Sequence, residues 1–297
     1  MTPASASTEA ALPIAPPRRA GRGLRRFARH RLALIGSCTI LFLVLASAFG
    51  PYLNPYDDLH IDIVHRFTAP FSGPHLLGTD QLGRDMLARL EKAGRISLTV
   101  GFAAMVLSIA AGTIIGVVAG YYGGIIGAAL MRFVDAVLCF PSIFLLLALA
   151  AFIEPTLFTI TVIIAATAWM EVARLVEAQI RALRDRDFAV AAMALGAPDH
   201  VIMFRELIPN ALAPIVVAAT LNVARAILLE SYISFLGYGI QPPVPSWGNM
   251  LNNAQDYLVT APWLAILPGA AITLAVTGFN FLGDGLRDAL DPRLDIR

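Results

Sequence analysis

Long apolar runs without a single charge constrain this chain more than any other feature. Residues 32–56 carry no charged side chain, and neither do residues 96–131. A helix of about 20 apolar residues crosses the hydrocarbon core of a membrane, so both runs are long enough to do so. Over the whole chain 14% of residues are charged, against about a quarter in soluble domains. The sequence therefore predicts an all-α protein that crosses a membrane several times.

Turn residues divide the apolar sequence into six expected membrane helices. A Gly-rich cluster at residues 120–124 ends one run, and Glu154-Pro155 breaks another. Ala46-Ser47-Ala48 resembles a signal-peptide cleavage site, but the uncharged run around it is longer than a signal core and further spans follow. The six helices are expected at residues 32–56, 97–120, 133–152, 156–174, 212–235 and 262–283.

The basic residues predict which side of the membrane each segment faces. Seven Arg precede the first apolar run, whereas the loop at residues 236–262 contains no Lys or Arg. Because basic residues favour the cytoplasmic side, both termini are expected in the cytoplasm. The expected organisation is a disordered basic cytoplasmic tail (1–31), a first membrane helix with an external segment (32–96), a core of five membrane helices (97–283) and a cytoplasmic tail (284–297).

Two further predictions concern the second helix and the residues before it. Residues 79–92 are amphipathic, with Thr79 or Asp80 as a cap, and should form a helix along the outer membrane surface. Gly112, Gly116 and Gly120 recur every four residues and therefore share one face of the second helix. Small residues at this spacing let two helices approach closely in lipid, although the same face could line a pore.

A charged segment at residues 177–210 interrupts the apolar sequence and predicts a first short helix outside the membrane. Asp187 can accept hydrogen bonds from the first backbone N–H groups of this helix. Phe188, Ala192 and Leu195 follow at spacings that place them on one helix face. Alanines occupy much of the rest, so a partner could approach closely.

A sharp turn and a second helix complete the segment. Gly196 suits the left-handed residue that ends a helix, and Pro198 prevents its continuation. Asp199 can cap the second helix, and Pro209 marks the return to the membrane. An amphipathic connector resting on lipid headgroups is one interpretation. Such helices usually carry bulky apolar faces, so this alanine-rich one favours docking of another protein.

Ala191-Ala192, Gly196 and Ile208-Pro209 match the cytoplasmic loop motif of ATP-binding-cassette importer permeases, which this segment resembles. Val190 and Glu206 replace the Glu and the first Ile of that motif. Four other stretches resemble the dipeptide and oligopeptide permeases of the second-subunit type. They are LGTDQLGRD from residue 77, AGYYGG from 119, FLGYGIQPP from 235 with PSWG from 245, and NFLGDGLRDALDP from 280.

The resemblance implies a type I importer permease in the bacterial cytoplasmic membrane. Its implied partners are a second homologous permease, two ATPase subunits that bind ATP and Mg²⁺, an external binding protein and the membrane lipid. The implied substrate is a peptide, and nucleic acid has no part. This chain would need no cofactor of its own and has no phosphate-binding loop. The residues implied to contact the ATPases are Asp187, Phe188, Ala191, Ala192, Leu195, Gly196 and Pro209.

Arg225 and Glu230 fall inside the expected fifth helix, where charges are costly and usually face a cavity or a partner. They lie about 140° apart around an ideal helix, so they are not expected to pair with each other. Two locations remain open, the transport pathway and the interface with the second permease. Asp135, Glu171 and Arg174 are expected near helix ends at the membrane surface.

Metal binding, catalysis and channel activity have little support in the sequence. The five His residues form no cluster with metal-ligand spacing, and the group around His60 and His65 fits a solvated external loop. No catalytic residues are predicted. Nickel or another small solute is the alternative substrate within the same importer subtype. A self-sufficient channel or an intramembrane enzyme would need catalytic groups within the spans, which the sequence does not indicate.

Overall fold

The computed structural model describes residues 26–290 of the 297-residue chain. Within this range it consists of helices joined by turns and loops, without a β-strand. Among the described residues, five helices are long and apolar enough to cross a membrane, and a bent pair would supply a sixth crossing. The all-α membrane fold predicted from the apolar runs is therefore confirmed.

Five long helices form the body of the molecule: α2 (Arg31–Leu53), α3 (Met86–Tyr122), α6 (Leu157–Arg184), α9 (Ile208–Phe235) and α11 (Trp263–Leu290). The shorter elements are η1 (Ile63–His65), α4 (Gly124–Leu138), α5 (Ser142–Phe152), α7 (Asp187–Ala194), α8 (Asp199–Val201), η2 (Ile202–Leu207), α10 (Trp247–Ala254) and η3 (Gln255–Tyr257).

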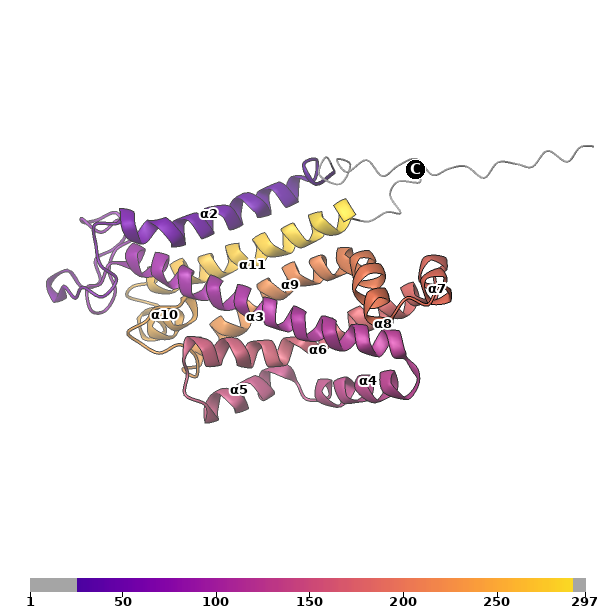
Figure 1. The fold of residues 1–297 in the computed structure, drawn as a ribbon. Helices are drawn as coiled ribbons and strands as arrows, with labels where there is room; N and C mark the ends of the chain where they lie inside the picture. The colour runs from indigo at the N-terminus through magenta and orange to yellow at the C-terminus, as the bar shows by residue number, and fades with distance from the viewer. Residues whose placement is uncertain (1–25, 291–297) are drawn as a thin grey trace, which may run out of the picture.

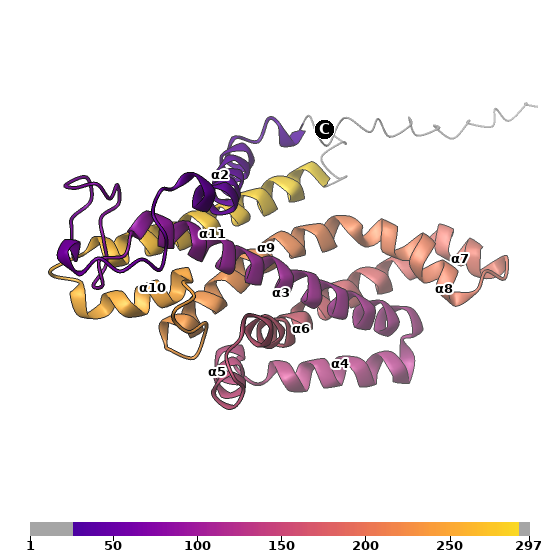
Figure 2. The same cartoon turned by 60° about the vertical axis from the view of Figure 1, so that its left-hand side comes forward.

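The long helices run in roughly the same direction and give the molecule two distinct ends (Figure 1). One end carries α7 and α8, and the other carries α10 together with the loop that follows α2. The view in Figure 2 shows the same separation, with α4 and α5 lying along α3 and α6. These are called the α7 end and the α10 end below.

The glycine face of α3 packs directly on α6. A Cβ atom added to Gly112, Gly116 or Gly120 would lie 2.6–2.8 Å from a backbone carbonyl oxygen of α6. Real Cβ atoms do not approach oxygen so closely, so only glycine permits this helix separation. The close-packing prediction for this face is confirmed.

The prediction of a separate surface helix at residues 79–92 is wrong. The helix begins at Met86 and runs without interruption to Tyr122, because no Gly-Pro break separates the amphipathic part from the apolar part. Its cap is Asp85, whose carboxylate accepts a hydrogen bond from the Ala88 N–H at 2.7 Å. Asp80 instead stabilises the preceding loop by accepting from the backbone N–H of Leu82 at 2.8 Å.

The single helix expected at residues 133–152 is two helices. α4 starts earlier, at Gly124 within the glycine turn, and ends at Leu138. α5 follows at a bend of 78°, with Pro141 as its N-cap. Proline has no N–H to continue the preceding helix, and its ring clashes with that helix's last turn. The chain therefore bends at Pro141.

The expected helix ends next to the charged segment also need correction. α6 continues to Arg184 rather than ending at residue 174, and Val176 and Ile180 in its extension are buried. Apolar residues at helical spacing thus carry the helix past the hydrophobic stretch. At the other side, Pro209 does not end an element, since Asp199–Phe235 is one helical stretch. The π-helical turn η2 ends at Leu207, and Pro209 lies in the first turn of α9, where the missing N–H of proline costs no helix hydrogen bond.

Candidate functional site

The first candidate site is α7 and the turn after it. Ala189 of α7 is fully buried in an apolar cluster that contains Ile180 of α6 and Ile202 and Leu207 of η2. The small side chain lets α7 pack tightly on these elements. Figure 1 shows that α7 is nevertheless the outermost element at its end of the molecule.

The other residues of α7 and its C-cap Leu195 include several exposed apolar side chains. Leu195 is 87% exposed, and Val190 is 52% exposed. We call the exposed set the docking surface; it comprises Phe188, Val190, Ala191, Met193 and Leu195. A cluster of apolar side chains on a helix that extends beyond the bundle is typical of a contact site for another protein.

Phe188 and Ala192 lie four residues apart on α7 and share a side of it as predicted, although Ala192 is half-buried against the apolar cluster. Two caps predicted for this segment are wrong. Asp187 is the first residue of α7 rather than its cap, and no side chain caps this helix. Asp199 is also a first residue, and its carboxylate accepts a hydrogen bond from the Tyr121 hydroxyl at 2.8 Å. That bond ties the second helix of the segment to the end of α3.

The turn after α7 confirms the prediction for Gly196. Its φ is +75°, in the left-handed region. The Ala197 N–H donates to the Ala192 carbonyl at 3.1 Å, and the Gly196 N–H donates to the Met193 carbonyl at 3.0 Å. This pair of bonds is the usual way in which a glycine ends a helix. No atom lies within 4 Å of a Cβ added there, so the backbone angle alone requires glycine.

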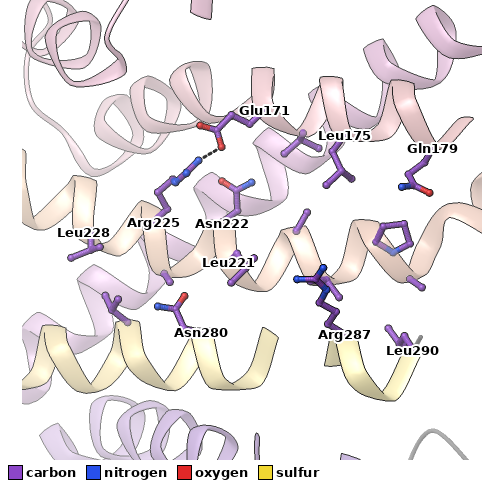
Figure 3. A pocket seen from close by; sticks show the side chains of 17 residues that line it. Glu171, Leu175, Gln179, Leu221, Asn222, Arg225, Leu228, Asn280, Arg287 and Leu290 are labelled. Carbon is purple, nitrogen blue, oxygen red and sulfur yellow. Dashed lines mark hydrogen bonds and ion pairs between the residues drawn. The ribbon is translucent and has the colours of Figure 1, made fainter. Parts of the chain in front are cut away.

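The second candidate site is a cavity of about 870 Å³ between α6, α9 and α11. Figure 3 shows side chains of all three helices directed toward it. Its wall is largely apolar, but six polar side chains interrupt it. They are Glu171 and Gln179 from α6, Asn222 and Arg225 from α9, and Asn280 and Arg287 from α11. A cavity with such a wall at membrane depth suits water and polar solutes better than lipid tails.

Arg225 forms an ion pair across this cavity wall with Glu171. Its Nη1 donates to Oε2 of Glu171, and both side chains remain more than half exposed, at 55% and 54% (Figure 3). Glu171 lies well inside α6 rather than at its end, because α6 is longer than expected. Glu171 could not be predicted as the partner of Arg225 from the sequence, because only the packing of α6 on α9 brings the two together.

Glu230 has a different environment and does not line the cavity. It is fully buried and accepts hydrogen bonds from the hydroxyls of Ser97 at 2.9 Å and Ser234 at 2.8 Å. Those hydroxyls accept in turn from the backbone N–H groups of Trp247 and Ile240, each at 3.2 Å. The Glu230 carboxylate thus joins α3 and α9 to the loop that leads into α10. As expected, it does not pair with Arg225.

The stretch at residues 77–85 forms a buried polar cluster at the α10 end. Arg84 Nε lies 2.7 Å from Asp80, and Arg89 Nε lies 3.5 Å from the same carboxylate. Asp85, besides capping α3, lies 2.9 Å from Nδ1 of His75. Across residues 26–290 no group of three or more His, Cys, Asp or Glu side chains is arranged to hold a metal ion. These residues organise the loop over the α10 end.

Comparison with known proteins identifies the family. Residues 112–296, more than half of the chain, match the family described as the inner membrane component of binding-protein-dependent transport systems. The chain belongs to this family. Residues 20–70 also match the N-terminal transmembrane domain of oligopeptide transport permease C. Membership of the family makes the chain a multi-pass component of the bacterial inner membrane, which confirms the predicted location.

Individual members of the family are similar over almost their whole length. The dipeptide transport system permease protein DppC of Alkalihalophilus pseudofirmus is 39% identical, over 91% of this chain and 88% of its own. The oligopeptide transport system permease protein OppC of Haemophilus influenzae is 38% identical, over 91% and 87%. The di/tripeptide transport system permease protein DppC of Pseudomonas aeruginosa is 39% identical, over 90% of each chain.

Proposed function

We propose that this inner membrane component is a permease subunit of an ATP-driven importer for dipeptides or oligopeptides. The observation that carries the proposal is the similarity of nine tenths of the chain to permeases named for dipeptide, tripeptide and oligopeptide transport. Nickel or another small solute is not favoured, because these relatives are all named for peptides. The partners of such a subunit are a second permease, two ATPases and an external binding protein.

The α7 end is proposed to face the cytoplasm. α2 begins there and α11 ends there, so Arg29, Arg31 and Arg287 lie at this end together with Arg184 and Arg186 beside α7. An excess of basic residues favours the cytoplasmic side. The α10 end, where the loop at residues 236–262 carries no Lys or Arg, would then face the binding protein.

The docking surface on α7 is proposed to contact an ATPase subunit. Phe188, Ala191 and Leu195 supply exposed apolar contacts, Asp187 adds a charge beside them, and Gly196 sets the direction of the turn. Ala192 and Pro209 support the segment from within. ATP and Mg²⁺ would be bound and ATP hydrolysed by the partner, and this chain would transmit the movement to the membrane helices.

The cavity between α6, α9 and α11 is proposed to be part of the transport pathway. Its six polar side chains lie on helices that run between the two ends of the molecule (Figures 1 and 3). Arg225 belongs to this pathway, whereas the buried position of Glu230 fits an anchor for the loop before α10. The second permease would close the open side of the cavity.

Uptake by the reconstituted complex tests this function. The gene for this chain is co-expressed with the neighbouring genes for the permease, the ATPases and the binding protein. The complex is then purified and placed in vesicles that contain ATP. A labelled dipeptide or tripeptide should accumulate only when ATP and the binding protein are present, and excess nickel should not compete. ATPase subunits that fail to copurify, or nickel uptake in place of peptide uptake, would refute the proposal.

A further inference from the structure

We propose that Glu171 and Arg225 form a binding site for the two charged termini of a peptide within the pathway. In this site the peptide carboxylate binds to the Arg225 guanidinium, and the peptide ammonium binds to the Glu171 carboxylate. The inference rests on the proposed function, because it requires that peptides enter this cavity. It adds a contact that would make the membrane pathway selective for zwitterionic chains.

The geometry leaves both members of the ion pair available to a ligand. Arg225 engages Glu171 through Nη1, and a guanidinium has four further N–H donors. Each side chain is more than half exposed, although both lie on helices within the membrane-spanning body. Figure 3 shows the pair at one side of the cavity, spanning the space between α6 and α9.

A second ion pair that links α6 to another helix lies outside the cavity. Arg174, three residues after Glu171, lies 3.4 Å from Asp135 of α4. Neither Arg174 nor Asp135 lines the cavity. An ion pair of similar exposure, 60% and 49%, therefore links α6 to α4 outside the cavity. This pair serves as a matched control.

An ion pair can bind a zwitterion without isolating any charge. When the peptide enters, its carboxylate takes the place of Glu171 on Arg225, and its ammonium neutralises Glu171. Each of the four charges has a partner when the peptide is bound, which avoids the cost of an unpaired charge within the membrane-spanning body. Because the internal pair competes with the peptide, binding stays weak. A transport pathway needs such weak sites so that the solute can leave again.

The rest of the wall fits the uncharged parts of a peptide. Asn222 lies one helical turn from Arg225, and Asn280 faces the cavity from α11 (Figure 3). Their amides can donate to and accept from peptide backbone groups. Leu221 and Leu228 provide apolar surface that tolerates many side chains. The volume of about 870 Å³ falls in the range of about 300–1,000 Å³ that is usual for small-molecule sites.

The test compares peptides with free and blocked termini in vesicles that hold the complete importer. Each peptide is offered with free termini, with an amidated carboxyl end, or with an acetylated amino end. The preference for free termini is the uptake rate of the free peptide divided by that of the blocked peptide. Each variant's preference is compared with that of the wild-type complex, so the constant contribution of the binding protein cancels. We expect Arg225→Gln to lower uptake of the free peptide about tenfold, the effect of losing one charge-assisted hydrogen bond. Uptake of the amidated peptide should change less than about twofold.

Glu171→Gln should show the complementary pattern, with acetylated peptides spared. The double variant E171Q/R225Q leaves no single charge unpaired and should lose the preference for free termini altogether. The control variant D135N/R174Q should keep that preference. An unchanged preference in the double variant, or an equal loss in the control, overturns the site.

Failure of this binding site and failure of the proposed function would give different results. Wild-type vesicles that take up no peptide refute the proposed function and the site with it, whereas wild-type uptake with an unaltered preference in the double variant refutes the site alone. If the double variant does not assemble, the wild-type complex decides the question. A peptide with a photoreactive group next to its carboxyl end must then label the segment at residues 221–228, and labelling elsewhere contradicts the site.

Discussion

Gly116 shows at the residue scale how a missing side chain sets the distance between two membrane helices. A Cβ there would lie 2.6 Å from the Ala173 carbonyl oxygen and 2.7 Å from Cβ of Val176. Neither is the flexible end of a side chain, so α3 and α6 would have to separate. The close packing of this helix face could be predicted because the spacing of the glycines is a local feature of the sequence.

Gly116→Val is therefore expected to destabilise the protein by about 1–3 kcal/mol, the usual cost of overpacking. Thermal unfolding of the purified complex measures this as a lower melting temperature. Gly269→Ala is the control, because a Cβ at Gly269 meets only Cδ2 of Leu251 at 3.9 Å. Equal melting temperatures for the two variants would contradict the close contact between α3 and α6.

Glu230 illustrates a buried carboxyl group held by hydroxyl groups. Glu230→Ala would leave the Ser97 and Ser234 hydroxyls without their acceptor and weaken the attachment of the loop before α10. A cost of about 1–3 kcal/mol for each unsatisfied buried group is expected. Limited proteolysis should cut the segment at residues 236–247 faster in this variant than in Glu230→Gln, which keeps the shape and one acceptor. Equal resistance of both variants to cleavage would contradict the anchoring role.

The side chains that bind Arg225 and Glu230 could not be predicted from the sequence. Arg225 and Glu230 stood out because charges are rare in membrane helices, and their positions alone excluded a mutual pair. The sequence did not distinguish their environments, because burial of Glu230 depends on Ser97, which lies 133 residues away. The pairing of Arg225 with Glu171, 54 residues away, depends equally on tertiary packing.

At the scale of elements, the number of membrane crossings was predicted better than the helix ends. Apolar length identifies a crossing, but a helix continues wherever its hydrogen bonds and its packing allow. α3 and α6 therefore extend past the charge-free stretches, to Met86 and Arg184 respectively. The bend between α4 and α5 had a visible signal in Pro141, which the length of the apolar run outweighed.

The turn at Gly196 has a matched counterpart at Gly237, which allows its role to be tested. Gly237 has a φ of +85°, the same pair of helix-ending hydrogen bonds, and no atom within 4 Å of an added Cβ. A β-branched residue at either position costs roughly 1–2 kcal/mol in backbone strain. Gly237 ends α9 at the α10 end, far from the docking surface.

Gly196→Val is expected to abolish most of the coupling between ATP hydrolysis and peptide uptake, because a rearranged turn would redirect α7. Gly237→Val should lower the stability of the protein about as much as Gly196→Val does. The number of peptides moved per ATP hydrolysed should stay close to the wild-type ratio in this control. That ratio is obtained by measuring uptake and phosphate release in the same vesicles. Coupling that survives in Gly196→Val would show that the turn does not position the ATPase contact.

In the molecule as a whole, the two ends differ in the residues they carry and in their proposed tasks. The α7 end carries the docking surface and many basic residues, and the α10 end carries the buried Asp80 and Glu230 clusters that fix its loops. The cavity lies on the helices that connect the ends (Figure 3). This arrangement suits a subunit that converts a movement at one end into a change of access along a pathway.

Site-specific photo-crosslinking tests this central claim most directly. Cys38 and Cys139 are first replaced by Ala, and a single Cys carrying a benzophenone is placed at Leu195 or at Val259, which are 87% and 96% exposed at the two ends. In the assembled importer the account predicts that the probe at residue 195 attaches to an ATPase subunit and that the probe at residue 259 does not. Attachment of the ATPase to residue 259, with none to residue 195, would contradict both the coupling surface and the orientation in the membrane.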